Sequence, residues 1–260
     1  MSTNRKGVAA VTGAAQGIGR AIALRLAEDG FDVCVNDIPS NAEKLDALVQ
    51  DIGNVGRASS AYPADVSVEE DVQKMVAQVV ETHGSLDVMV ANAGICPWFT
   101  LADISVEEWD RLMAVNVRSM FLCYRHAAAQ MVVQGNGGRL IGACSASGKR
   151  PANKFMGAYC ASKFAVRGLT QAAALEFGPH KITVNAYAPG PVDTDMLRFL
   201  EDSNTTSSGG SLTERMKATI PLGRVATTED VANLVSFIAS EKSSFITGQS
   251  LSVNGGIFMD

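Results

Sequence analysis

The chain has 260 residues, 47% of them hydrophobic and 19% charged, and its net charge at pH 7 is -5. A chain of this kind can bury about 70 to 75% of its unfolded surface around one large core, which excludes a disordered protein. The acidic balance and the scattered basic residues offer no footprint for nucleic acid or for an anionic membrane, and we expect neither as a partner.

Several features indicate a cytoplasmic protein. Residues 1–7 lack the apolar core of a signal peptide, and no uninterrupted apolar run is long enough to cross a bilayer. The five cysteines are odd in number and include no C-x-x-C pair, so we expect reduced thiols. His83, His126 and His180 lack the spacing of metal ligands, and we expect no metal site.

Short apolar runs alternate with longer amphipathic stretches along the chain. Strands are expected near residues 9–11, 31–36, 57–62, 86–91, 139–143, 183–188 and 250–253. Helices are expected in the six gaps between these strands. Segments 67–70 and 105–108 each begin with a serine and end with a glutamate, which is the pattern of a capping box. Gly30 and Gly84 follow helical stretches, where left-handed helix ends usually lie.

Alternating strands and helices predict parallel pairing through right-handed crossovers. We therefore expect a single domain over residues 1–260 with a Rossmann-like, doubly wound α/β fold, in which a seven-stranded parallel sheet has helices on both faces. Ligands of such folds bind at the carboxyl ends of the strands. Residues directly after each strand are therefore the first candidates for a functional site.

The segment after the first strand is rich in glycine and leads into a helix-forming stretch. It reads Thr12-Gly-Ala-Ala-Gln-Gly-Ile-Gly19. A dinucleotide pyrophosphate requires a tight turn, bare backbone and the unpaired amides of a helix start, and glycines allow all three. A hairpin or an ordinary strand-to-helix loop would also contain glycines. The residues expected to meet the dinucleotide are Gly13, Gln16, Gly17, Ile18 and Gly19.

Asp37 follows the second strand, where a carboxylate can accept hydrogen bonds from the hydroxyls of an adenosine ribose. The alternative is an ordinary turn aspartate. A 2′-phosphate about 4 Å from this carboxylate would cost about 4 kcal/mol, and neither Gln16 nor Ile38 supplies a compensating cation. The expected cofactor is therefore NAD in preference to NADP.

Tyr159 and Lys163 are four residues apart in an expected helix, so their side chains point the same way. A phenol with a pKa of about 10 is a poor base at neutral pH, but an adjacent ammonium and an oxidised nicotinamide ring both favour the phenolate. This spacing alone also occurs by chance. Together with the glycine segment, Asp37 and a serine after the preceding strand, it predicts acid–base chemistry beside a dinucleotide.

From about residue 7 onward the chain resembles the classical short-chain dehydrogenase/reductase family. The resemblance is carried by the glycine segment 12–19, Asp65-Val66, Asn92-Ala-Gly94, Asn116-Val117, Ser145, Tyr159-Cys-Ala-Ser-Lys163 and Pro189-Gly-Pro-Val-Asp-Thr194. It implies that Tyr159 is the general acid/base and that Ser145 orients the substrate oxygen. It also implies that Lys163 binds the nicotinamide ribose and lowers the pKa of Tyr159, and that Asn116 holds a water linking Lys163 to solvent.

The same resemblance implies further cofactor contacts. Asp65 and Val66 are expected against the adenine, Asn92 and Gly94 along the adenosine side and ribose, and Val192 and Thr194 at the carboxamide. Pro189 and Gly190, in the same segment as Val192, complete the expected cofactor contacts together with Tyr159 and Lys163.

The catalytic serine has a rival. Ser145 is one residue further from Tyr159 than is most common in the family, and Ser147 lies two residues on. We favour Ser145 because Gly148 completes a Ser-x-x-Gly pattern with it, and because the additional residue can fall in the loop 149–157.

The substrate is less well defined by the sequence. Segments 163–171 and 182–190 resemble acetoin and 2,3-butanediol dehydrogenases of this family. The expected substrate wall is apolar and consists of Trp98, Phe99, Phe155, Met156, Leu197 and Phe199, although each could be ordinary core or surface. The polar run 202–210 is expected to be mobile, within a substrate lid over about 195–220. A lipophilic secondary alcohol or ketone and a small acetoin-like diol or diketone are both compatible with this wall.

The favoured function is an NAD-dependent alcohol dehydrogenase/ketone reductase, because each catalytic position is filled. A non-catalytic NAD-binding regulator would lack Tyr159 or Lys163, and an NAD-dependent epimerase or dehydratase normally resembles a longer chain with an added substrate domain. The helical stretches 106–131 and 159–177 and the segment 250–259 carry more apolar surface than one sheet covers. With the resemblance, this predicts a homotetramer.

Overall fold

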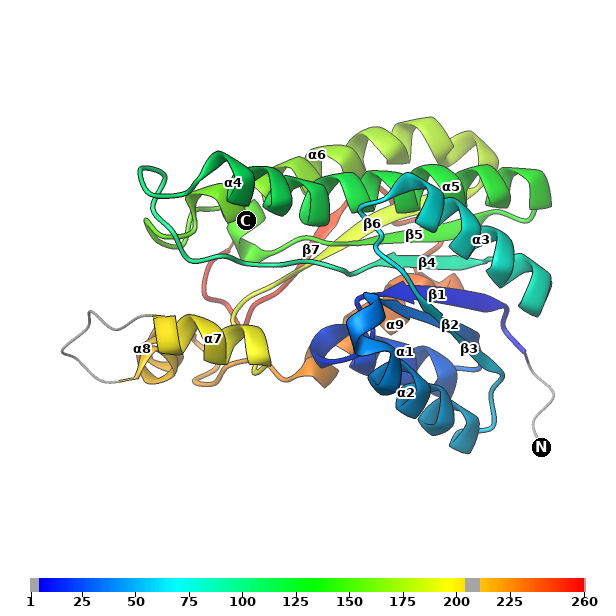
Figure 1. The fold of residues 1–260 in the computed structure, drawn as a ribbon, viewed down its shortest axis with the longest axis horizontal. Helices are drawn as coiled ribbons and strands as arrows, with labels where there is room; N and C mark the ends of the chain where they lie inside the picture. Colours follow the sequence, from blue (N-terminus) through cyan, green and yellow to red (C-terminus); the bar gives the residue numbers. More distant parts are fainter. Residues whose placement is uncertain (1–4, 204–210, 260) are drawn as a thin grey trace.

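A computed structural model describes residues 5–203 and 211–259, and within these residues seven strands form one parallel sheet in the order β3-β2-β1-β4-β5-β6-β7 (Figure 1). The strands are β1 (Val8–Thr12), β2 (Asp32–Asp37), β3 (Ser59–Pro63), β4 (Val88–Ala91), β5 (Gly138–Ala143), β6 (Ile182–Pro189) and β7 (Ser250–Val253). The order reverses between β1 and β4, the switch point at which doubly wound sheets bind ligands. The predicted fold class is confirmed.

The described residues contain nine α-helices instead of the six predicted. They are α1 (Gly17–Glu28), α2 (Ala42–Asn54), α3 (Glu69–His83), α4 (Val106–Met113), α5 (Ser119–Gln134), α6 (Gly157–Phe177), α7 (Asp195–Ser203), α8 (Leu212–Thr219) and α9 (Thr228–Ala239). A π-helical turn over Ala114–Arg118 divides the expected helix 106–131, and α7 and α8 are additional elements between β6 and α9. Gly30 and Gly84 both have a positive φ, as predicted for residues at helix ends.

The sheet separates two cores because successive side chains of a strand point to opposite faces. Met89 and Leu140 pack into the core shared with α3, α5 and α6. Val90 and Ile141, their neighbours in sequence, pack into the core shared with α1, α2 and α9. Figure 1 shows these two helical layers on either side of the sheet, with α7 and α8 beyond the carboxyl ends of the strands.

One of the two predicted helix caps is present. The Oγ atom of Ser105 accepts a hydrogen bond from the amide of Glu108 at 3.1 Å, at the start of α4. The prediction for segment 67–70 is wrong, because α3 begins at Glu69 and the side chain of Ser67 does not cap it. The Asp65 carboxylate accepts from the amide of Ser67 at 2.9 Å and forms a turn before the helix.

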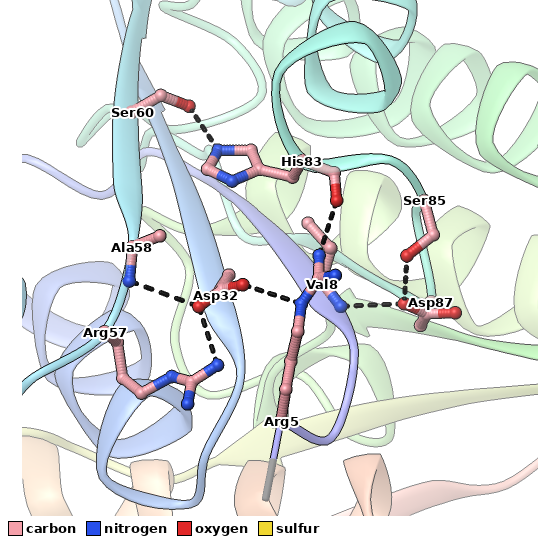
Figure 2. Close-up of polar contacts among 9 residues, drawn as sticks. All are labelled: Arg5, Val8, Asp32, Arg57, Ala58, Ser60, His83, Ser85 and Asp87. Carbon is pink, nitrogen blue, oxygen red and sulfur yellow. Dashed lines mark hydrogen bonds and ion pairs between the residues drawn. The ribbon is translucent and has the colours of Figure 1, made fainter. Parts of the chain in front are cut away.

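At the amino-terminal ends of the strands, a polar network joins β2, α3 and the segment before β1 (Figure 2). The two carboxylate oxygens of Asp32 bind Arg5 Nε and Arg57 Nη2, each at 2.7 Å. Arg5 also donates to the carbonyl of His83, and His83 Nε2 lies 2.9 Å from Ser60 Oγ. This network lies far from the carboxyl ends of the strands, so we assign it to stability.

His83 makes this network sensitive to pH. Burial, reinforced by the positive charge of Arg5, holds the pKa of His83 below its usual value, although Asp32 acts in the opposite direction. As the pH falls through about 6.5, the unfolded chain gains a proton that the folded chain resists, so acid lowers the free energy of unfolding. We expect the wild type to lose more stability than His83→Gln between about pH 7.5 and pH 5.5 in urea titrations. Identical losses would contradict this role of His83.

Candidate active site

A cavity of about 350 Å³ lies at the carboxyl ends of β1, β2, β4, β5 and β6. The predicted residues in its wall are Gly13, Gln16, Gly17, Ile18, Gly19, Asp37, Asn92, Gly94, Tyr159, Lys163, Pro189 and Thr194. A larger surface hollow of about 920 Å³ lies over α4, α5 and α6, but its wall contains none of the predicted residues. The cavity at the strand ends is therefore the candidate active site.

The glycine segment forms one end of this cavity. Gly13 and Gly17 have φ values of 63° and 55°, in the left-handed region that favours glycine. A Cβ atom on Gly19 would lie 2.2 Å from the carbonyl oxygen of Gly13, so this position requires glycine as well. Helix α1 begins at Gly17 without a side-chain cap on its first turn. Its unpaired amides are therefore free to bind an anion.

Asp37 lies at the end of β2 in the cavity wall. One of its carboxylate oxygens accepts from the amide of Ala15 at 3.1 Å, and the other accepts from Ile38 N and Asn41 Nδ2, both at 2.9 Å. These three donors fix the carboxylate between the glycine segment and the start of the next helical stretch.

Lys44 is a nearby cation that the sequence analysis missed. Its ammonium donates to Gln16 Oε1 at 2.7 Å, so one positive charge lies at the same end of the cavity as Asp37. Lys44 lies in the first turn of α2, the helix that follows the end of β2, and this place is the signal that could have indicated its position.

Tyr159, Lys163 and Ser145 come together as predicted from their order in the chain. The ammonium of Lys163 lies 5.5 Å from the centroid of the Tyr159 ring and donates to the carbonyl of Ala143 at 2.7 Å. The side chain of Ser145 is near enough to the phenol of Tyr159 to oppose the rise in its pKa. The Oγ atom of Ser145 accepts from the amide of Ser147 at 3.0 Å. The structure therefore places Ser145 beside the phenol, although outside the cavity wall.

Burial shifts the pKa values of both Tyr159 and Lys163. Removal from bulk water raises the pKa of Tyr159, and the side chain of Ser145 opposes this shift only in part. Burial lowers the pKa of Lys163 for the same reason, since a low-dielectric site disfavours any charged form. The sequence analysis expected Lys163 to make the phenol more acidic. In the structure, desolvation of both groups is the larger effect.

Asn116 is placed by the π-helical turn between α4 and α5. Its Oδ1 atom accepts from the amide of Ile95 at 2.8 Å. Its Nδ2 atom donates to the Ile95 carbonyl at 2.9 Å and to Ser162 Oγ at 3.1 Å. The carboxamide therefore ties the π-helical turn to the segment after β4 and to α6.

Four of the six predicted substrate-wall residues form one cluster. Trp98 and Phe155 stack with their ring centroids 5.2 Å apart, and Phe99 pairs with Met156 in a short bridge. Leu197 and Phe199 belong to α7 instead; Leu197 is buried and Phe199 is 54% exposed. None of the six contributes to the wall of the cavity that contains Tyr159.

Several further residues of the wall were not predicted, among them Cys144 and Tyr187, whereas Asp195 and Met196 belong to the segment 195–220 that was predicted as a lid. Cys144 and Tyr187 could have been found because they lie at the carboxyl ends of strands. Asp195 and Met196 directly follow Thr194, which the sequence analysis had already placed at the site.

The remaining predicted cofactor residues lie outside the cavity wall and have structural contacts. Val66 is buried in the core beside α3, and Asp65 binds the turn before that helix. The amide of Gly190 donates to the carbonyl of Val253 at 3.1 Å, which joins the segment after β6 to β7. Val192 is buried and pairs with Ala226.

The chain belongs to the short-chain dehydrogenase/reductase family, whose members are oxidoreductases that use a nicotinamide cofactor. The family model described as enoyl-(acyl carrier protein) reductase matches residues 13–258. A short-chain dehydrogenase/reductase from Armillaria gallica is 54% identical, over 100% of this chain and 98% of the relative. The 3-oxoacyl-(acyl-carrier-protein) reductase FabG of Staphylococcus aureus is 42% identical, over 96% of this chain and 98% of the relative.

Solved structures agree with this assignment. A short-chain type dehydrogenase/reductase from Mycobacterium marinum has a TM-score of 0.91 and 34% identity, and the match covers 98% of this chain and 97% of that one. The acetoin dehydrogenase YohF from Salmonella typhimurium has a TM-score of 0.85 and 34% identity, and the match covers 96% of this chain and 95% of that one. A Burkholderia cenocepacia short chain dehydrogenase in complex with NADP has a TM-score of 0.88 and 35% identity, and the match covers 97% of this chain and 98% of that one.

No helix in residues 5–203 and 211–259 combines the length and the apolar character that a membrane span requires. The same residues contain no group of three or more His, Cys, Asp or Glu side chains arranged to hold a metal ion.

Proposed function

We propose that this chain is an NAD-dependent oxidoreductase that interconverts a secondary alcohol and a ketone by hydride transfer. The observation that carries the proposal is the placement of Tyr159 and Lys163 in the cavity wall, with the ammonium of Lys163 5.5 Å from the centroid of the phenol ring and Ser145 beside the phenol. The glycine segment contributes to the same cavity, so a dinucleotide bound there would lie beside the phenol.

The chain supplies the proton chemistry. A bound nicotinamide supplies the hydride acceptor or donor. During alcohol oxidation Tyr159 takes the hydroxyl proton at Oη, and Ser145 holds the substrate oxygen by a hydrogen bond. Desolvation raises the pKa of Tyr159. The positive charge of Lys163, 5.5 Å from the ring, acts in favour of the phenolate. In ketone reduction the phenol returns the proton to the oxygen.

The proposed substrate is a lipophilic secondary alcohol or ketone, or a small acetoin-like diol or diketone. The stacked rings of Trp98 and Phe155 support an apolar wall close to the start of α6. The relative named acetoin dehydrogenase supports the smaller substrate. We propose that α7 and α8, within residues 195–220, form the substrate lid; most of the run 202–210 lies outside the described residues.

We propose NAD as the preferred cofactor because Asp37 presents a carboxylate at the cavity wall. The second candidate is NADP, which is favoured by the ammonium of Lys44 beside Gln16 and by the relative that was solved with NADP. The ratio of kcat/KM for NAD over NADP in the wild type decides between them, and a ratio below one would contradict the proposal.

The double substitution Asp37→Ser and Ile38→Arg tests the role of the carboxylate. It removes the repulsion of a 2′-phosphate and adds a cation, so the NAD-to-NADP ratio of kcat/KM is expected to fall by up to about a thousandfold. Steady-state kinetics with both cofactors measures this ratio. An unchanged preference for NAD would show that Asp37 does not select the cofactor.

The two serines are distinguished by single alanine substitutions. Ser145→Ala removes the hydroxyl that contacts Tyr159 and is expected to lower kcat by about 10²-fold, the lower end of the usual effect of acid–base groups. Ser147→Ala leaves that hydroxyl in place and is expected to retain most activity. The reverse outcome, with Ser147→Ala inactive and Ser145→Ala active, would assign the role to Ser147.

The reaction class is tested with a panel of secondary alcohols and ketones. The proposal predicts that NADH appears in a one-to-one ratio with the ketone formed from at least one alcohol. Tight binding of NAD without a net change in NADH would favour a non-catalytic NAD-binding regulator, or an epimerase or dehydratase that regenerates its cofactor in each cycle.

We also propose a homotetramer. The hollow over α4, α5 and α6 has an apolar wall that includes Met113, Val117, Phe121 and Leu169, and Phe121 is 44% exposed. Val133 and Leu175 are exposed on α5 and α6. Apolar surface of this extent is typical of faces that bind other subunits.

A further inference from the structure

We propose that Tyr187 is a positioning residue for dinucleotide binding, which it supports through Asn92. Tyr187 lies on β6 and is almost completely buried, with an exposed fraction of 1%, yet its side chain reaches the wall of the active-site cavity. Its Oη atom donates a hydrogen bond to Asn92 Oδ1 at 2.7 Å. Asn92 follows β4, so the phenol spans from one strand across β5 to the end of another.

Ala143, the residue beside Tyr187 on the neighbouring strand β5, is small enough for the phenol to extend across that strand. Tyr187 is in register with Ala143 of β5, and residues in register on parallel strands point to the same face of the sheet. Both pack against the core shared with α1 and α9. Because alanine has only a methyl group, the space above β5 at this level is open to the tyrosine ring.

Asn92 passes this contact on to the glycine segment. Its Nδ2 atom donates to the carbonyls of Thr12 at 2.8 Å and Gly13 at 3.0 Å, and its amide nitrogen donates to Thr12 Oγ1 at 3.0 Å. The carboxamide can hold both carbonyls only with its oxygen turned away from them. The phenol, as a donor to that oxygen, stabilises this one orientation.

The consequence is a preorganised binding loop. A Cβ atom on Gly13 would lie 3.0 Å from Asn92 Nδ2, and one on Gly19 would lie 2.5 Å from it, so the carboxamide is in close contact with both ends of the glycine segment. Without the phenol, Oδ1 of Asn92 loses this donor at a partly buried site, and the carboxamide can rotate. The loop would then have to be ordered at the moment of binding, which weakens the affinity for the dinucleotide.

The phenol of Tyr187 acts on binding and not on proton transfer. Its hydroxyl proton is already donated to Asn92, whereas the phenol of Tyr159 lies beside Lys163 and Ser145. We therefore expect a change in the dissociation constant and in the KM for the dinucleotide, with kcat little affected. This inference rests on the proposed dinucleotide site.

The test is Tyr187→Phe, with NADH as the probe and its fluorescence as the measure of binding. The dissociation constant is expected to rise about fivefold to tenfold, which corresponds to about 1.0 to 1.4 kcal/mol of binding free energy. The matched control is Tyr124→Phe, because Tyr124 is also buried and its phenol contacts the carbonyl of Asn185 at 3.4 Å, in the other core. The control is expected to lose stability but to bind NADH like the wild type.

A double-mutant cycle with Asn92→Ala tests the route of the effect. In the Asn92→Ala background, Tyr187→Phe is expected to change NADH binding less than twofold, because the acceptor of the phenol is gone. In this pair of variants the carbonyls of Thr12 and Gly13 have lost the Asn92 donor equally, so their difference measures the phenol alone. The comparison keeps the test available if Tyr187→Phe by itself is unstable. An unchanged dissociation constant in Tyr187→Phe, an equal rise in Tyr124→Phe, or full additivity in the cycle would overturn the proposal. A wild type that binds neither NADH nor NADPH would overturn the dinucleotide site itself, and the role of Tyr187 with it.

Discussion

Replacement of Tyr159 by phenylalanine is expected to lower kcat by about 10²-fold to 10⁴-fold, the usual effect of removing a general acid or base. The ring would still fill its place in the cavity wall, so the affinity for NADH should stay within about twofold of the wild-type value. The physical reason is that Tyr159 has the phenol that contacts Ser145, and the ammonium of Lys163 lies beside its ring.

Two measurements isolate this effect. Steady-state kinetics gives kcat, and NADH fluorescence gives the dissociation constant. Tyr124→Phe is again the matched control, since it removes a buried phenol from the other core and should leave kcat unchanged. If Tyr159→Phe oxidises alcohols at the wild-type rate, the proton is transferred by another group and the proposed mechanism is wrong.

The second large effect is expected for Gly19→Ala. The added methyl group would lie 2.2 Å from the carbonyl oxygen of Gly13 and 2.5 Å from Asn92 Nδ2, so the glycine segment must move away from its binding geometry. Strain of this kind costs about 1 to 3 kcal/mol, and we expect the dissociation constant for NADH to rise about 10-fold to 100-fold.

Gly53→Ala is the control for this substitution. A Cβ atom on Gly53 would meet nothing within 4 Å, and the residue lies inside α2, where alanine stabilises a helix by about 0.5 to 1 kcal/mol relative to glycine. This variant should bind NADH like the wild type and unfold at an equal or slightly higher urea concentration. Wild-type binding by Gly19→Ala would show that the first turn of α1 does not contact the dinucleotide.

The fold could be predicted because its signals are local and repeated. Each buried strand has a continuous apolar run, and each gap between strands has a stretch long enough for a helix. The division of the helix 106–131 was not predictable, because the π-helical turn depends on the contact of Asn116 with Ile95, two residues far apart in sequence. Helix α8 was missed because its polar sequence lacks the apolar stripe of a core helix. Helix α7 does have such a stripe, since Leu197 and Leu200 are three residues apart and both buried, so this spacing is the signal that could have indicated it.

The site was predictable where a residue type coincides with a strand end, as for Asp37, or where two residue types share a face of a helix, as for Tyr159 and Lys163. It was not predictable where a role depends on the environment. The raised pKa of Tyr159 follows from desolvation, which no spacing in the sequence reveals. The contact of Tyr187 with Asn92 crosses an intervening strand, so it could not be expected before the order of strands was known.

The central claim is that the cavity at the strand ends transfers a hydride between a secondary carbinol carbon and a nicotinamide while Tyr159 carries the proton. Oxidation of an alcohol deuterated at the carbinol carbon tests it most directly, with the label in the recovered NADH measured by mass spectrometry. The proposed mechanism predicts one deuterium in each NADH formed, and labelled NADH that forms about 10²-fold to 10⁴-fold more slowly in Tyr159→Phe. Deuterium that is retained in the alcohol or released to water, or labelled NADH formed at the wild-type rate in Tyr159→Phe, would contradict it.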